Sequence, residues 1–121
     1  MALIGGLLFT TATMAQTGSF TITNTTTSTY DVKVGSSSDL SCTTLNSSGI
    51  YSCGPGTTVI PDLGFAGRWV AFKAKDGCGL NGVENTAVGC YGYGVSTSTF
   101  VDCNSNTVTL TYVDWFNGSI N

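Results

Sequence analysis

The chain has few side chains that could do chemistry, and their types exclude the commonest catalytic arrangements. There is no histidine among the 121 residues, so a Ser-His-Asp or Cys-His arrangement cannot form. The segment "GVSTS" (94–98) resembles a nucleophile elbow around Ser96, but that motif needs glycine where Ser98 stands. The carboxylates are scattered, and nothing in their spacing fixes an acid–base pair. We therefore predict no catalytic residue, no cofactor and no enzymatic activity.

The segment 76–85, "DGCGLNGVEN", holds the best candidates for a metal ligand. Asp76, Asn81 and Glu84 offer the oxygen atoms that calcium prefers. The order of acids in an EF-hand is missing, and ordinary Asn-Gly turn chemistry explains the same letters. These three residues are weak calcium candidates, and the sequence otherwise predicts no metal site.

Five cysteines form the next group: Cys42, Cys53, Cys78, Cys90 and Cys103. Without a C-x-x-C motif or histidine they match no zinc pattern, whereas small exported domains commonly contain disulfides. Short loops favour the pairs Cys42–Cys53 and Cys78–Cys90, with Cys90–Cys103 as a rival to the second. Because the count is odd, one thiol is left over, and in the favoured scheme it is Cys103. We favour a buried free thiol over a bond between subunits.

Four aromatic residues are candidates for contact with a ligand: Trp69, Tyr91, Tyr93 and Trp115. If Val70 and Phe72 face the core, strand alternation turns Trp69 to the opposite face of its strand. Tyr91 and Tyr93 are two residues apart, so the same alternation puts both on one side of their segment. Exposed aromatic rings among neutral polar residues suit stacking on sugars or contact with proteins. In the alternative, which we favour because large rings are usually mostly buried, Trp69 and Trp115 cap the two ends of the core.

The elements that must position these residues are short strands with a period of two, separated by Gly, Ser and Asn clusters. No segment has a helical period over ten residues, and 76–89 reads as a long loop. The predicted strands are 19–24, 30–34, 49–53, 57–61, 68–75, 90–95, 98–103 and 107–115. Seven or eight short strands at this spacing predict an all-β, antiparallel β-sandwich stapled by disulfides.

The apolar residues of these strands define the expected core. In each strand they alternate with polar residues, so one face of the strand is buried. The predicted core is Phe20, Ile22, Tyr30, Val32, Val34, Val59, Val70, Phe72, Phe100, Val108, Leu110 and Tyr112.

The first residues predict export. The apolar run 2–9 is shorter than the ~20 residues that a membrane-spanning helix needs. Small residues at Thr13 and Ala15 suit a signal peptidase, so we expect a cleaved signal at 1–15 and a single domain at 16–121. No Lys or Arg precedes the run, and the alternative is that this segment is retained as part of the core.

The composition restricts the partners of this chain. Four basic residues against seven acidic ones argue against a nucleic-acid partner, whose phosphates are neutralised by Lys and Arg, and against anionic membranes. Charged residues make up only 9% of the chain, compared with about 25% in ordinary soluble domains. Because charges on sheet edges prevent strands of different molecules from pairing, self-association of this chain is weakly opposed.

Two stretches, "SFTITNTTTSTYDVKV" and "GPGTTVIPDLGFAGRWVAFKA", give a resemblance. Residues 19–74 resemble the opening half of a thaumatin-like domain, through Asn24, Pro55-Gly56 and Gly67-Arg68-Trp69. The chain as a whole resembles small secreted bacterial β-sandwich proteins. The many cysteines and the acidic cleft of thaumatin-like proteins are absent, so the resemblance implies an exported sandwich and transfers no glucan-related activity or site residue.

These observations predict a secreted structural or adhesive protein, located outside the cell or at its surface. It would be a self-assembling fibre subunit whose Thr-rich first strand pairs with a neighbour. Its partners would be copies of itself, an extracellular surface or a glycan, with no nucleic acid and no membrane span after signal cleavage. The alternative is a monomeric module that binds a glycan or protein through exposed Trp and Tyr residues.

Overall fold

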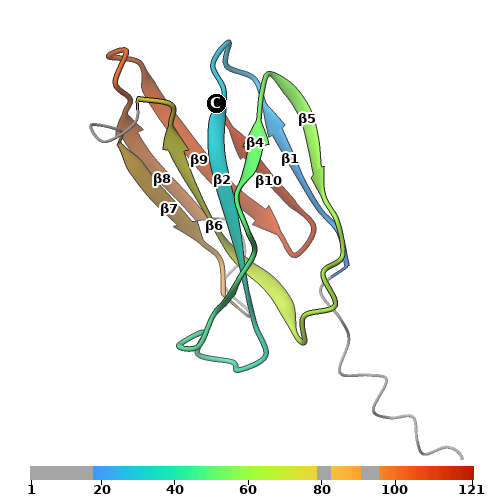
Figure 1. The fold of residues 1–121 in the computed structure, drawn as a ribbon. Coiled ribbons are helices and arrows are strands. Elements are labelled where there is room, and N and C mark those ends of the chain that lie inside the picture. Colours follow the sequence, from blue (N-terminus) through green and yellow to red (C-terminus); the bar gives the residue numbers. More distant parts are fainter. Residues whose placement is uncertain (1–17, 79–82, 91–95) are drawn as a thin grey trace, which may run out of the picture.

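The chain forms two β-sheets packed face to face in the computed structural model (Figure 1). The structure describes residues 18–78, 83–90 and 96–121. The predicted signal, 1–15, lies outside them. The described residues form ten strands and no helix, so the predicted all-β sandwich is confirmed with slightly more strands than expected. None of these residues belongs to a helix long and apolar enough to cross a membrane.

The first sheet, which we call the threonine sheet, has the strand order β5-β1-β10-β9-β8. Apolar residues of β1 and β9 are buried on its inner face, so the alternating threonines of both strands lie on its outer face. Neighbouring strands are antiparallel except β1 and β10, which run parallel. The bounds are β5 Gly56–Ile60, β1 Phe20–Asn24, β10 Asn117–Ile120, β9 Thr107–Asp114 and β8 Ser96–Val101.

The second sheet, which we call the lysine sheet, has the order β3-β2-β6-β7, and β4 also pairs with β2. Its strands β2 and β6 hold all four basic residues of the chain. All its strand pairs are antiparallel. The bounds are β3 Asn46–Ser47, β4 Tyr51–Cys53, β2 Tyr30–Ser37, β6 Arg68–Asp76 and β7 Glu84–Val88.

Three strands were not expected from the sequence: β3, β7 and β10. The prediction of a long loop at 76–89 is wrong for β7, which pairs with β6 over five residues. Of the β7 side chains only Ala87 is buried, so the strand has no apolar alternation that a sequence pattern could detect. The strand β7 is therefore held by its backbone pairing with β6 and not by burial of its own side chains.

The core between the sheets contains nearly all the residues that alternation predicted. Eleven of the twelve are buried; the exception is Val59, which is 56% exposed. Val59 and Ile60 are adjacent, so only one of them can face inward, and Ile60 does. Large residues that the prediction missed are Trp69, Ile60 and Ile120, all with no exposed surface.

Trp69 faces the core because β6 contains a bulge. Ala71 pairs with Gly35 and Trp69 pairs with Ser36, so Val70 is an extra residue on β6. A bulge of one residue shifts the alternation, and Trp69 and Val70 are therefore both fully buried. The expectation that Trp69 points away from the core is wrong for this reason.

The disulfide pairs differ from the expected ones. Cys42 is bonded to Cys90 and Cys78 to Cys103, with Cα–Cα distances of 6.0 and 6.3 Å. The prediction of Cys42–Cys53 is wrong because β4 directs Cys53 into the core, where it is 1% exposed. The prediction of Cys78–Cys90 and its rival Cys90–Cys103 are wrong because Cys90, at the end of β7, meets Cys42 in the loop after β2. The free thiol is Cys53 rather than Cys103, and it is buried, as favoured. Burial raises its pKa.

Candidate functional site

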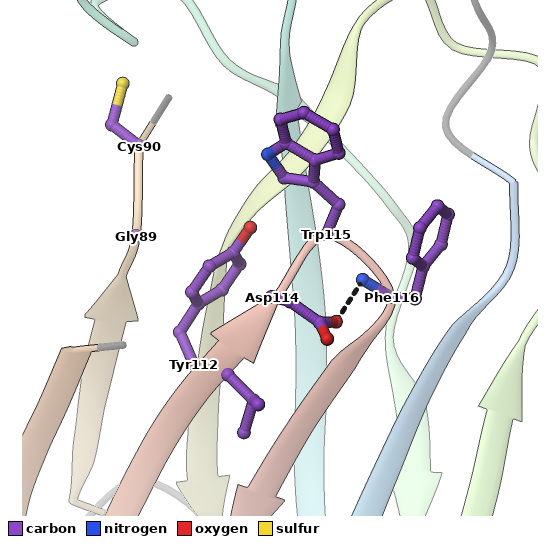
Figure 2. A pocket seen from close by; sticks show the side chains of 7 residues that line it. Gly89, Cys90, Tyr112, Asp114, Trp115 and Phe116 are labelled. Carbon is purple, nitrogen blue, oxygen red and sulfur yellow. Dashed lines mark hydrogen bonds between the residues drawn. The ribbon is translucent and has the colours of Figure 1, made fainter. Parts of the chain in front are cut away.

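A shallow apolar hollow of about 290 Å³ lies where the turn between β9 and β10 meets the end of β7. Its exposed rings are Trp115 and Phe116, which are 37% and 51% exposed. Figure 2 shows both rings projecting from the turn, with the Tyr112 side chain rising from β9 beside them. The lining residues are Gly89, Cys90, Tyr112, Val113, Asp114, Trp115 and Phe116.

Hydrogen bonds hold the turn that presents these rings. Asp114 Oδ1 accepts from the backbone N–H of Phe116 at 2.8 Å (Figure 2) and from Asn117 Nδ2 at 2.9 Å. The carbonyl oxygen of Phe116 accepts from the backbone N–H of Thr21 at 2.8 Å, which ties the turn to β1. Because the backbone is fixed on both sides, the rings stay at the surface and do not fold into the core.

Arg68 fixes the position of the Trp115 ring. Its guanidinium carbon lies 4.7 Å from the ring centroid, a cation–π geometry. Arg68 Nη1 donates a long bond to the carbonyl of Gly67 at 3.3 Å, and Nε has no hydrogen-bond partner in the described part of the chain. The contact therefore holds the Arg68 guanidinium against the indole of Trp115, which lines the hollow.

Of the four predicted contact aromatics, the structure describes Trp69 and Trp115, and these two do not lie in one site. Trp115 is exposed at the hollow, whereas Trp69 is in the core, where its Nε1 donates to the carbonyl of Gly18 at 2.9 Å. Tyr91 and Tyr93 lie outside the described residues. The interpretation that both tryptophans cap the ends of the core is wrong for Trp115. Phe116 and Arg68 are not among the four predicted residues; Trp115 and Phe116 form the turn itself, and Asn117 already belongs to β10.

Of the weak calcium candidates, Asp76 and Glu84 lie in the described part of the chain, and the carboxylate of each has protein partners. Asp76 Oδ2 accepts from the backbone N–H groups of Val83 and Cys103 at 3.1 and 2.9 Å, and Oδ1 accepts from that of Cys78 at 3.2 Å. Its carboxylate thus organises the chain around the Cys78–Cys103 disulfide. Glu84 is directed to Lys73, with 3.5 Å between Oε2 and Nζ. Asn81 lies outside the described residues.

A second feature is the separation of charge between the two sheets. The only charged residue in the strands of the threonine sheet is Asp114, at the end of β9. The edge strands of this sheet, β5 and β8, contain no charge. The neutral edges are a candidate interaction surface because an unprotected edge exposes backbone N–H and C=O groups that another strand can pair with.

Comparisons of this chain with family models, curated proteins and solved structures gave no match.

Proposed function

We propose that this chain is an extracellular structural or adhesive protein that associates with copies of itself by strand pairing at the threonine sheet. The observation that carries the proposal is the lack of charge in both edge strands of that sheet. Natural sheets usually protect their edges with lysine, proline, bulges or very short strands. An edge without charge has little to oppose a second molecule.

The location of the pairing strand differs from the expected one. Within one chain β1 already has β5 on one side and β10 on the other, so it is not free to pair with a neighbour. Strand pairing between molecules therefore has to use the strands at the edges. The proposal includes no catalytic activity. This agrees with the lack of histidine and with the Asp76 carboxylate, which already accepts hydrogen bonds from three backbone N–H groups.

The two disulfides support a location outside the reducing cytoplasm. Disulfides persist in oxidising compartments and are rare in the cytosol. A structural or adhesive role outside the cell also needs a fold that survives without chaperones, and two bridges supply a large part of that stability.

Sedimentation velocity over a hundredfold range of concentration tests the proposal. We expect the wild-type chain to form species heavier than a monomer as concentration rises. Val59→Lys should weaken this association at least tenfold, because Val59 is exposed on β5. Ser52→Lys on the lysine sheet is the matched control, since Ser52 is also exposed, and it should leave association unchanged. A wild-type chain that stays monomeric throughout would contradict the proposal.

A second candidate function is the binding of a neutral glycan, and the hollow at Trp115 favours it. Sugars stack their C–H faces on aromatic rings, and Trp115 is already oriented by Arg68. The hollow is at the lower end of the size range of small-molecule sites, which suits one sugar ring at a chain end or within a polymer.

Affinity electrophoresis in gels containing hydroxyethyl cellulose or soluble starch tests this candidate. Retardation of the wild-type chain should be lost in Trp115→Ala and Phe116→Ala. Ile50→Ala is the control, because Ile50 is 64% exposed but does not line the hollow. Equal mobility of all four proteins in every gel would rule out these glycans as ligands of the hollow.

A further inference from the structure

The two edges of the threonine sheet are not equally free. Figure 1 shows β8 beside β7 at one side of the sandwich and β5 at the opposite side. At the first side, Asn85 on β7 donates its Nδ2 to the carbonyl of Thr99 on β8 at 3.2 Å. In the described part of the chain, the only backbone hydrogen bonds of β5 are those with β1. The edge at β5 is thus the open one.

The register of β1 shows which backbone groups of β5 face outward. The N–H groups of Thr21 and Thr25 donate to the carbonyls of Phe116, just before β10, and of Ile120, its last residue. Ile22 therefore directs its backbone groups to β5, where it pairs with Thr58. Neighbouring residues of a strand direct these groups to opposite sides. Thr57 and Val59 therefore present their N–H and C=O groups at the free edge.

Two prolines limit the length of this edge. Pro55 precedes β5 and Pro61 follows it, and proline has no N–H to donate to a ladder. Both lie three residues from Thr58, so the pairing segment is symmetric about that residue. A segment with this symmetry is suited to antiparallel pairing with an identical segment, because a two-fold axis through Thr58 keeps the prolines at the ends.

We propose that β5 of one copy pairs with β5 of a second copy about a two-fold axis through Thr58, which gives a closed dimer and not a fibre. This inference rests on the proposed self-association and names its partner surface. Thr57 of each copy lies opposite Val59 of the other, and the two pairs exchange four backbone hydrogen bonds. Val59, which is 56% exposed in the single chain, gains a β-branched neighbour on the outer face.

The dimer closes because each copy uses β5, the one open edge that the described part of the chain leaves on the threonine sheet. A head-to-tail contact between β5 and β8 would extend without limit, but it would require β7 to release the carbonyl of Thr99. A strand pair of five residues buries less than the ~800 Å² per partner of a standard interface, so the dimer is weak and depends on concentration.

Charge substitutions at the two facing positions test the geometry. The double variant Thr57→Lys/Val59→Lys puts like charges opposite each other in the two-fold pair, and we expect a dissociation constant at least tenfold higher. The variant Thr57→Glu/Val59→Lys puts opposite charges there, and we expect it to restore the dimer at low salt and less so at high salt. Thr97→Lys/Thr99→Lys on β8 is the matched control and should leave the dimer intact.

Sedimentation equilibrium, with circular dichroism to verify folding, gives the readout. A mass limit at two copies, lost in the double-lysine variant and regained in the charge-swapped one, supports the two-fold dimer. Assemblies beyond two copies, or association lost in the β8 control, would overturn the dimer while leaving self-association in place. A wild-type chain that is monomeric at every concentration would overturn both.

Discussion

At the scale of single residues, the two tryptophans have opposite roles that their sequence contexts do not reveal. Trp69 is completely buried and packs against Phe20 and Phe65, with ring centroids 6.5 and 5.8 Å away. The hydroxyl of Tyr112 donates to the Trp69 carbonyl at 2.7 Å, so the two sheets are joined at this point. Trp115 projects from a turn, is 37% exposed and contacts the guanidinium of Arg68.

Because the two tryptophans differ in burial, we predict that replacing each by alanine lowers the free energy of unfolding by different amounts. Trp69→Ala should lower the free energy of unfolding by about 3–5 kcal/mol, because it empties a large volume in the core. Trp115→Ala should cost less than about 1 kcal/mol, the value of an exposed cation–π contact. Urea unfolding followed by circular dichroism measures both, and similar costs for the two variants would contradict the assigned positions.

At the scale of elements, the loop after β2 is organised by one carboxylate. Asp39 accepts hydrogen bonds from the backbone N–H groups of Thr43 and Thr44, each at 3.1 Å, and from the hydroxyl of Ser41. These bonds, that from Thr43 above all, lower the pKa of Asp39 to about 2. The loop carries Cys42, so the carboxylate also positions a disulfide.

The lowered pKa of Asp39 predicts the pH range in which the loop is ordered. A depressed pKa means that the hydrogen bonds are complete above the ordinary value of 3.8 and are lost as the pH falls through about 2. NMR amide shifts of Thr43 and Thr44 should titrate together with a midpoint near 2. Asp39→Asn should abolish that titration, and a midpoint close to 4 in the wild-type chain would show that the bonds are absent.

At the scale of the whole molecule, two disulfides connect segments that are distant in sequence, with separations of 48 and 25 residues. Cys42–Cys90 joins the loop after β2 to the end of β7, and Cys78–Cys103 joins the ends of β6 and β8. The second bridge connects the lysine sheet to the threonine sheet. Loop closure of this length restricts the unfolded chain strongly.

The disulfide pattern predicts which cysteine variants destabilise the fold. Replacing both members of either pair by serine should cost about 3–4 kcal/mol in the loop-entropy model. Cys53→Ala should keep both bridges and cost far less. Urea unfolding of the three variants, with peptide mapping under non-reducing conditions, measures this. A peptide that links Cys42 to Cys53 would refute the pairing.

What the sequence by itself determined was the local alternation. A period of two is set by backbone geometry, so an all-β sandwich, eleven of twelve core residues and an uneven number of thiols followed from the sequence alone. Only the tertiary structure decided that Trp69 faces the core, which cysteines pair, that β7 is a strand and how charge is divided between the two sheets. Each depends on contacts between segments far apart in the chain: a bulge opposite β2, loop ends that meet in space, a strand held by its neighbour. Local patterns hold no information about such contacts.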